Sequence, residues 1–391
     1  MPMLQGVRVV DLTTTFMGPY CTMLLARMGA DVIKVEAPGG DVVRRIGPSR
    51  NPGMGPVFLA ANHGKRSVVL DLKDPDGLAA LRDLVAGADV FVTNLRPAAV
   101  ATLGVGAADL AASGLVHCTL PGFGSAGPYG DRAAYDDVIQ AGCGLAAVQG
   151  GSGEPDYVRS VVADKTVALM ASSAILAALV GRAATGRGRV LEVPMFETMA
   201  SFTLLEQQFG HVFTPPEGPV VYPRTASPNR RPYRTADGYL GVVVYTDKQW
   251  LTFFDLIERP DLAADPRFAT ITGRTDNIDE LYGLLAAVLP ARTTAEWVAV
   301  LDAAGIPAQP VLGVDDVLAD PHLAEVGLFE PVAHHSEGAL ELPRLPVTVD
   351  GAAAAPVRGA PRLGEHGEEV LREAGFTAER IAALRASGTL G

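Results

Sequence analysis

Cysteine is scarce in this chain: its 391 residues include only three, Cys21, Cys118 and Cys143. Their wide separation excludes a paired-cysteine metal motif and gives no disulfide framework, which is typical of a reduced, cytoplasmic protein. The adjacent His334 and His335 have no carboxylate or cysteine nearby at a spacing suited to a shared metal. We therefore expect no metal site.

Positive charge is also in short supply. The chain has 32 Lys and Arg residues against 44 Asp and Glu residues, which gives a formal net charge of −12. A surface of this sign repels the phosphate backbone, so we expect no nucleic-acid partner. A small anionic ligand remains compatible with this charge where basic residues gather locally.

Long hydrophobic runs are missing as well. The N-terminus has no basic region followed by an apolar stretch, so the sequence predicts no signal peptide. The most apolar helix candidate, residues 167–180, is interrupted by Ser172 and Ser173 and is too short to cross a bilayer. We interpret it as a buried core helix and expect no membrane partner.

Short apolar segments alternate with helical ones through the first half of the chain. The segments GVRVVDL, DVIKVE, RSVVLDL and DVFVTNL are rich in β-branched residues, and the stretches between them have helical apolar spacing. Strands joined by helices at this spacing form right-handed crossovers and a mainly parallel sheet. Near-continuous apolar strands indicate a sheet that is covered on both faces. The expected fold class is therefore α/β.

The second half of the chain has a different composition. A Pro- and Arg-rich stretch, residues 214–240, is interpreted as a linker into a second, smaller domain. Two domains are expected in any case, because 391 residues exceed one ordinary core. In the smaller domain Thr293 and Glu296 have the spacing of a capping box. Trp250 and Trp297 are expected to pack in its core.

The glycine-rich segment GFGSAG, Gly122 to Gly127, has the spacing of a dinucleotide-binding motif and follows a predicted strand. That motif requires a helix to open within it, so that the helix N-terminus faces the pyrophosphate. Here PYGDR follows, and Gly130 so soon after Pro128 favours a turn. We favour a backbone loop lying close to some ligand over a nicotinamide site.

Asp164 precedes an Ala-rich apolar run and has two interpretations. Aspartate is a favoured helix N-cap, although the third position after it is Val167, so no capping box supports this role. Alternatively, a carboxylate that the positive end of the helix dipole keeps ionised and oriented is a competent nucleophile. The two interpretations do not exclude each other, and the local sequence favours the cap.

Motifs in a fixed order over nearly the whole chain resemble the class III CoA-transferases, the family that includes formyl-CoA transferase and carnitine CoA-transferase. No single motif is decisive, but their order is highly specific. The matching segments are GVRVVDLTTTFMGPYCTMLLARMGADVIKVEAPGGD, KRSVVLDLKDPDG, DVFVTNLRP, GFGSAGPY, YDDVIQAGCG, ADKTVALMASSAILAAL, TGRGRVLEVPMFE, PYRTADGYL, DPRF, GIPAQPV and APRLGEH.

The resemblance implies an architecture that spacing alone does not reveal. A large Rossmann-like domain would be built from both chain ends, residues 1–205 and 326–391. A linker, residues 206–232, would lead into a small α+β domain at residues 233–325. Two subunits would interlock like links of a chain to form a homodimer, and the linker would take part in this threading.

The resemblance also implies an enzyme that moves CoA from a donor acyl-CoA to a small carboxylic acid, with acyl-CoA as substrate and no tightly bound cofactor. Asp164 stands where the family's nucleophilic aspartate lies. Its carboxylate would attack the donor thioester, which gives an aspartyl anhydride and then an aspartyl-CoA thioester. The incoming carboxylate would take over the CoA through a second anhydride. Backbone N–H groups of a glycine loop would stabilise each oxyanion.

Several positions match family segments that contact CoA. In chain order they are Phe16, Met17, Leu70, Asp71, Leu72, Lys73, Asn94, Leu95, Gly122 and Phe123. Lys73 and Arg96 are candidate partners of the CoA phosphates, because charge-assisted contacts suit these groups. A solvated surface position explains either residue equally well. Tyr135 and Asp136 are expected to line the thioester end of the site.

The chain departs from the family pattern at a few positions. Thr102 stands where relatives often carry arginine, and Phe16 stands where formyl-CoA transferase has glutamine. The run of glycines in that enzyme has no counterpart before DGYLGVVVYTD. These departures disfavour oxalate and formate as substrates. Arg230, Arg231 and Arg234 are candidates either for a second substrate carboxylate or for an interface.

Two alternative functions stay open. α-Methylacyl-CoA racemase has the same fold but places histidine before aspartate, where this chain has Tyr135 before Asp136. Tyrosine, with a pKa of about 10, is a poor general base at neutral pH, which disfavours the two-base mechanism. A CoA- or dinucleotide-binding protein without transferase chemistry would tolerate a change of Asp164 or would bind nicotinamide.

Overall fold

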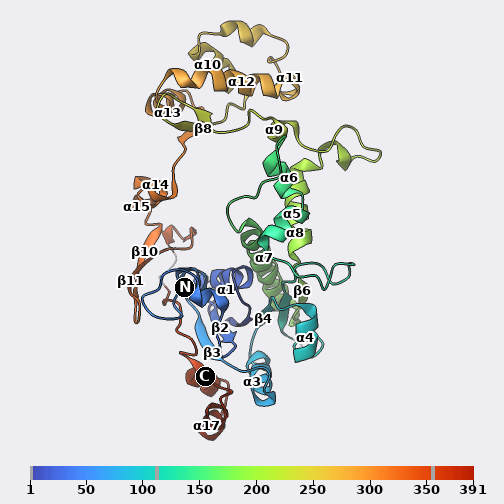
Figure 1. The fold of residues 1–391 in the computed structure, drawn as a ribbon, viewed down its shortest axis with the longest axis vertical. Helices are drawn as coiled ribbons and strands as arrows, with labels where there is room; N and C mark the ends of the chain where they lie inside the picture. Colours follow the sequence, from blue (N-terminus) through green and yellow to red (C-terminus); the bar gives the residue numbers. More distant parts are fainter. Residues whose placement is uncertain (1–2, 111–113, 354–356) are drawn as a thin grey trace. The chain divides into compact units, whose positions relative to one another are not determined.

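The computed structural model describes residues 3–110, 114–353 and 357–391. The chain divides into two compact units, whose elements are labelled in Figure 1. The first unit comprises Met1–Cys143, Val158–Phe202 and Ala324–Gly391, and the second comprises Gly144–Tyr157 and Thr203–Leu323. In this division, residues 144–157 and the expected linker, residues 206–232, group with the second unit.

The first unit is built on a six-stranded parallel sheet. Its strands are β1 (Arg8–Leu12), β2 (Asp31–Glu36), β3 (Arg66–Val69), β4 (Val90–Thr93), β5 (Val116–Thr119) and β6 (Val190–Glu192). The order across the sheet is β3-β2-β1-β4-β5-β6, and each neighbouring pair is parallel. The predicted α/β fold with a mainly parallel sheet is confirmed. The strand order reverses direction between β1 and β4, which is the point where such sheets bind ligands.

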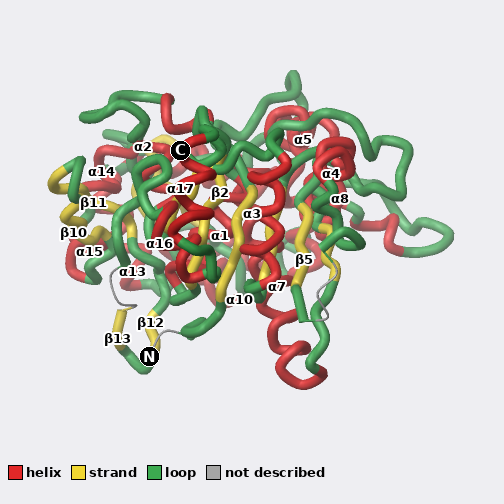
Figure 2. The backbone as a smooth tube through the Cα atoms, turned by 90° about the horizontal axis from the view of Figure 1, so that it is seen from below, coloured by secondary structure: helices red, strands yellow, loops and turns green. Residues whose placement is uncertain are grey.

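Helices cover the sheet because alternate side chains of each strand need a packing partner on each face (Figure 2). Val10 and Ile33 belong to a core that also contains Leu81 of α3. The neighbouring residues of each strand point to the opposite face of the sheet. On that face, Asp11 of β1 accepts a hydrogen bond from the hydroxyl of Thr22 of α1. The helices of this unit are α1 (Met17–Arg27), α2 (Pro56–Asn62), α3 (Pro75–Ala86), α4 (Pro97–Leu103), α5 (Asp136–Gly142), α7 (Val162–Thr185), α16 (Gly367–Glu373) and α17 (Ala378–Ala386).

The C-terminal segment packs onto the sheet formed by the N-terminal part of the chain. Leu390 forms an isolated antiparallel bridge with Leu70, directly after β3. Arg380 of α17 forms an ion pair with Asp83 of α3 at 2.9 Å, and the two helices lie side by side in Figure 1. This segment also carries the hairpin β10 (Phe329–His334) and β11 (Gly338–Pro343) and the short pair β12 (Thr348–Val349) and β13 (Ala352–Ala353). Sequence ends that are far apart therefore share one core.

Helix α7 is longer and less buried than expected. It has 24 residues, so by length and composition alone it could cross a membrane, and 33% of its most apolar window is buried. Ser172 and Ser173 do not interrupt it, because both hydroxyls donate to the carbonyl of Leu169 at 2.9 Å. Its buried side packs against α1 and β5. The helix is therefore longer than the expected segment, residues 167–180, and only one side of it is a buried part of the core.

The second unit combines a small antiparallel sheet with helices. Its core contains Trp250 and Trp297, as predicted. Thr293 and Glu296 form the predicted capping box at the start of α13. Its strands are β7 (Tyr233–Arg234), β8 (Tyr239–Val242) and β9 (Ala308–Pro310), and its helices include α6 (Leu145–Gly150), α9 (Pro223–Ala226), α10 (Asp247–Leu256), α11 (Ile271–Asp276), α12 (Ile278–Val288), α13 (Thr294–Ala303) and α14 (Val314–Leu318). Helices α8 (Met195–Gln207) and α15 (Pro321–Glu325) include residues of both units.

Candidate active site

A cavity of about 350 Å³ lies at the carboxyl ends of four neighbouring strands of the parallel sheet. The segments that directly follow β1, β4 and β5 line it, together with Met195 after β6 and Asp164 in the first turn of α7. Ligands bind at this edge in open parallel sheets, where the strand order reverses. The lining residues are Thr14, Thr15, Phe16, Met17, Asn94, Arg96, Pro97, Leu120, Pro121, Gly122, Gly130, Arg132, Ala133, Ala134, Tyr135, Asp164 and Met195.

Asp164 occupies the third position of α7 and is not its N-cap, which is Val161. The helix begins earlier than the sequence pattern indicated, so the side chain of Asp164 makes no capping bond and lines the cavity. Burial and, to a smaller extent, the negative charges of Asp136 and Asp137 together raise the pKa of this carboxyl to about 7. The helix dipole, which we expected to keep Asp164 ionised, is opposed here by burial and by two like charges.

Asp136 is buried behind the cavity and holds the first turn of α7 in place. Its Oδ1 accepts the backbone N–H of Asp164 at 2.9 Å, and its Oδ2 accepts from the side-chain amide of Gln140 at 2.6 Å. The same Gln140 accepts the N–H of Val158 at 2.9 Å, so it ties down the segment that leads into α7. Tyr135 lines the cavity and is 72% exposed.

Gln140 was missed by the sequence analysis. It is fully buried one turn after Asp136, and a glutamine four residues after an aspartate at a helix start was the available signal. Of the two residues expected to line the thioester end, Tyr135 lines the cavity and Asp136 does not.

The glycine-rich segment after β5 is a turn without a helix, as predicted. Its Gly124 and Ser125 amides donate to Glu197 and Glu192 at 2.9 and 2.8 Å, which anchors the segment to β6 and α8. Their N–H groups are therefore occupied. Gly122 faces the cavity, and among the described residues no acceptor contacts the N–H groups of Gly122 and of the residue after it.

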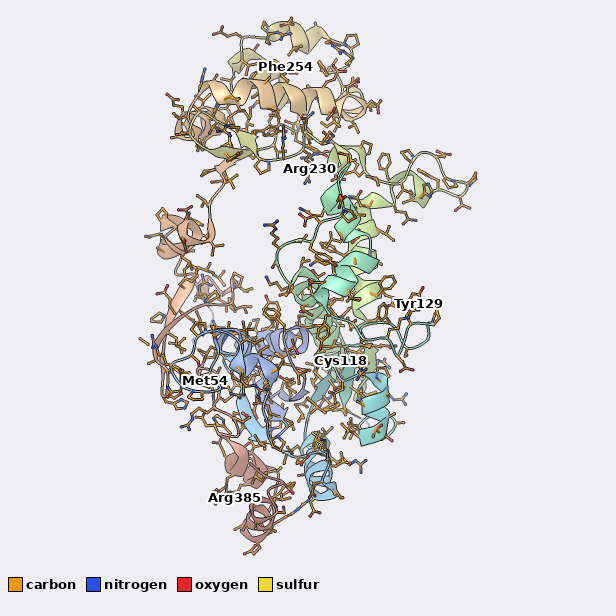
Figure 3. All side chains as sticks on the ribbon, in the orientation of Figure 1. Met54, Cys118, Tyr129, Arg230, Phe254 and Arg385 are labelled. Atoms are coloured by element: carbon orange, nitrogen blue, oxygen red, sulfur yellow. The ribbon has the colours of Figure 1, made fainter. Side chains whose placement is uncertain are left out.

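Aromatic rings stiffen the same segment. Phe123 is 8% exposed and does not line the cavity. Its ring packs at 5.7 Å from that of Tyr129 and at 5.5 Å from that of Phe196. Figure 3 labels Tyr129 on this loop and Cys118 on the strand that leads into it. The Phe123 side chain thus packs within the loop and away from the cavity. Its predicted contact beside the thioester remains a prediction, and it concerns the backbone of Phe123 only.

Asn94 and Arg96 follow β4 and line the cavity, but in different ways. The Asn94 side-chain amide pairs with the backbone of Thr14, accepting its N–H and donating to its carbonyl, both at 2.9 Å. Arg96 lies at the N-cap of α4. Arg132 joins it in the lining and stacks over the Tyr129 ring at 3.8 Å. Neither guanidinium has a carboxylate partner within the described part of the chain.

The other predicted CoA contacts lie outside this lining. Leu70 is fully buried, because the bridge to the C-terminal Leu390 covers it, so its side chain is a core residue. Asp71 turns the chain after β3 by accepting the N–H of Lys73 at 3.0 Å. Leu72 and Leu95 pack against the core, while Lys73 is exposed at the same edge of the sheet. The structure thus brings together Phe16, Met17, Asn94, Arg96, Gly122, Tyr135 and Asp164 around one cavity.

Two other sequence features do not line the cavity. Thr102, where relatives often carry arginine, bonds its hydroxyl to the carbonyl of Ala98 within α4. Arg230, Arg231 and Arg234 belong to the second unit, while all residues that line the cavity belong to the first.

Comparison with known proteins assigns the class to which this fold and site belong: an enzyme that transfers CoA. The chain belongs to CoA-transferase family III, whose family model matches residues 4–367. The resemblance drawn from the ordered motifs is therefore confirmed. CoA thioesters are the substrates of this family.

Curated relatives match over almost the whole chain. Succinyl-CoA:glutarate CoA-transferase of Mus musculus is 31% identical over 381 residues, covering 95% of this chain and 86% of the relative. Succinate–glutarate CoA-transferase of Agrobacterium fabrum is 31% identical over 394 residues, covering 97% and 98%. The crystal structure of Rv3272 from Mycobacterium tuberculosis superposes with a TM-score of 0.81 at 31% identity, covering 93% of this chain and 97% of that one.

Proposed function

We propose that this protein exchanges CoA between small dicarboxylates, with Asp164 as the covalent nucleophile. The observation that carries the proposal is the placement of Asp164: it is the carboxylate of the cavity, in the first turn of α7, and its pKa is raised to about 7. At that pKa a substantial fraction is ionised at neutral pH, and its carboxylate is more basic and more nucleophilic than an ordinary one.

The reaction proceeds in two matched halves. The Asp164 carboxylate attacks the carbonyl carbon of the donor thioester, and the C–S bond breaks to release CoA thiolate and leave an aspartyl anhydride. The thiolate then attacks the aspartyl carbonyl of the anhydride, which frees the donor acid and gives an aspartyl-CoA thioester. The acceptor carboxylate attacks the carbonyl carbon of that thioester, and the C–S bond breaks to release CoA thiolate again and leave a second anhydride. The returning thiolate attacks the acceptor's carbonyl, so that acceptor-CoA leaves and the Asp164 carboxylate is restored.

The surrounding residues have separate tasks in this scheme. The N–H groups of Gly122 and Phe123 face no acceptor among the described residues, and we assign them to the oxyanion of each tetrahedral intermediate. Asp136 holds the Asp164 amide and so fixes where the nucleophile begins. Because each intermediate is also open to hydrolysis, the cavity must exclude water during transfer.

Dicarboxylates are proposed as substrates because of the charge on the cavity wall. Arg96 and Arg132 both line it, and a carboxylate that remains free on a bound acyl group needs such a partner. The relatives support this choice, since their names specify succinate with glutarate, mesaconate or citramalate. We assign Arg96, beside the expected CoA segment, to a CoA phosphate, and Arg132 to the distal carboxylate.

We further propose that two copies form the interlocked homodimer implied by the family resemblance. The support is the solvent side of α7, where Leu169, Met170 and Val180 are 51%, 53% and 73% exposed. An apolar helix face of this kind is typical of a surface that another chain covers.

A substrate panel tests the proposed function. Succinyl-CoA and other acyl-CoA donors are crossed with glutarate, mesaconate, citramalate and monocarboxylic acids, and the CoA esters formed are identified by mass spectrometry. Transfer to dicarboxylates that is abolished in Asp164→Ala, together with a hydroxylamine-sensitive adduct on the peptide containing Asp164, is the expected result. Rapid α-proton exchange on a 2-methylacyl-CoA without any transfer would instead indicate a racemase.

A further inference from the structure

The turn between β1 and α1 has a backbone that its sequence does not favour. Thr14, Thr15 and Phe16 line the cavity that holds Asp164. Thr15 has a φ of +72°, in the left-handed region that β-branched residues rarely adopt. Such a conformation persists only where its surroundings enforce it, and it is found most often at ligand-binding sites. The contacts of this turn therefore indicate what its shape is for.

Three separate groups hold three consecutive residues of the turn. The Thr15 N–H donates to both carboxylate oxygens of Asp41 at 3.1 Å. The ammonium group of Lys34 donates to the carbonyl of Thr13 at 2.8 Å and to Asp41 Oδ2 at 3.1 Å. Asn94 pairs with the backbone of the residue between them. One side of the turn faces the cavity, and the other side rests on a buried ion pair.

The ion pair between Lys34 and Asp41 has no access to solvent. Both side chains are 0% exposed. A second pair, Lys65 with Asp11, is equally buried, and Asp11 accepts the N–H of Thr13 at 3.0 Å. Two complete ion pairs therefore lie beneath a single tight turn.

Stability does not explain these charges. Removing two charges from water is so unfavourable that an apolar pair of similar volume is often at least as stable as a buried ion pair. What an apolar pair cannot do is donate to one particular carbonyl and accept from one particular N–H. Directional bonds are what a strained turn needs if it is to keep one conformation in the absence of ligand.

We propose that Lys34 and Asp41 are positioning residues that hold the Thr13–Phe16 turn in its acyl-CoA-binding shape. Neither residue lines the cavity, so both act through the turn. The site is thereby formed before the substrate arrives, and acyl-CoA does not have to order the turn when it binds. This proposal rests on acyl-CoA as the substrate of the cavity, as argued above.

The test replaces the ion pair with an apolar pair of similar volume, Lys34→Met with Asp41→Leu. The variant is expected to fold, and its KM for acyl-CoA and Kd for CoA are expected to rise about tenfold. kcat is expected to change by less than about threefold, because Asp164 and Asp136 are untouched. In the Lys34→Met background, Asp41→Asn keeps an acceptor for the Thr15 N–H and should recover part of the lost affinity.

A different buried ion pair in the same unit, away from the turn, provides the matched control. Arg27 of α1 pairs with Glu330 of β10, and neither residue lines the cavity. Arg27→Met with Glu330→Leu is expected to leave KM and Kd unchanged. An equal rise in KM in both variants would indicate a general loss of order and would overturn the proposal.

Two further results separate failure of this proposal from failure of the proposed function. Wild-type protein that transfers CoA, together with a folded Lys34→Met/Asp41→Leu variant of unchanged KM and Kd, overturns the positioning role alone. If the wild-type protein neither binds CoA nor transfers it, the proposed function fails. In that case a crystal structure of the variant decides: a turn with Thr15 still at positive φ overturns the proposal, and a relaxed or disordered turn supports it.

If the double variant does not fold, the single variant Asp41→Asn takes its place in every measurement, with a smaller rise in KM expected.

Discussion

Two demands on Asp164 oppose each other at the scale of the single residue. A nucleophile must be ionised, yet this carboxyl lies partly buried near Asp136 and Asp137, which raises its pKa to about 7. The same raised pKa makes the ionised form more basic than an ordinary carboxylate and therefore a better nucleophile. The raised pKa thus lowers the ionised fraction of Asp164 at neutral pH and increases the nucleophilicity of the ionised form. It also lowers the free energy of unfolding at pH values where the buried carboxyl is ionised.

The stability consequence is tested by Asp164→Asn. The pKa of this carboxyl is about 7 in the folded state and about 4 in the unfolded state. Between these two values the unfolded state loses its proton more readily, so the free energy of unfolding falls as the pH rises from about 4 to about 7. The variant should therefore be more stable than wild type at pH 8, by on the order of 3 kcal/mol. The two proteins should converge near pH 3. Denaturant unfolding at both pH values measures this, and transferase activity should fall at least about a thousandfold.

The pH dependence of catalysis follows from the same shift. If the ionised Asp164 is the nucleophile, kcat/KM of the wild-type protein should rise with pH and level off above a midpoint near pH 7. Asp137→Asn removes one of the two like charges and no bond to α7, so it should move that midpoint to lower pH while the enzyme stays active. A midpoint that does not respond to Asp137→Asn would assign the titration to another group.

At the scale of the structural element, the segment after β5 works because a glycine brings two chain segments into contact. A side-chain Cβ at Gly122 would lie 2.4 Å from the Cβ of Ala134, well inside van der Waals contact. The amides at 124 and 125 are fixed to two glutamates on β6 and α8. A segment clamped in this way cannot move aside to accept even one methyl group.

Gly122→Ala is therefore expected to destabilise the protein by about 1–3 kcal/mol and to lower kcat, since the loop that lines the cavity must shift. Ala134→Gly removes the opposing methyl group, after which the nearest atom to the new Cβ is 3.6 Å away. The double variant should regain most of both losses. Thermal melting and transfer assays on the three variants measure this, and a double variant no better than Gly122→Ala would contradict the packing argument.

At the scale of the whole molecule, α7 presents one face to its own unit and an apolar face to solvent. Asp164 lies in the first turn of this same helix. If a second copy covers the outer face, assembly and the position of the nucleophile depend on the same helix.

Met170→Glu tests this dependence, because an unpaired charge buried in an interface is strongly unfavourable. The variant is expected to elute as a monomer in size-exclusion chromatography with light scattering, where the wild-type protein elutes as a dimer, and to lose most of its activity. Ala383→Glu places the same charge at an exposed position of α17 and should leave mass and activity unchanged. A wild-type monomer with full activity would show that the apolar face has another role.

Local patterns in the sequence were sufficient for the elements whose cause is itself local. The alternation of apolar segments and helices predicted the parallel sheet, because covered parallel strands need near-continuous apolar runs. The capping box at Thr293 and Glu296 follows from a three-residue spacing. The order of motifs over the chain predicted the family.

Only the tertiary structure decided the features that depend on residues distant in sequence. The pKa of Asp164 depends on its burial in the folded chain and on the charge of Asp136, 28 positions earlier, and a helix dipole read from the local sequence includes neither. Leu70 became a core residue because the chain end at Leu390 returns to cover it. Burial, charge repulsion and the enforcement of a strained turn all act across space, and a linear pattern records only what neighbouring residues do to each other.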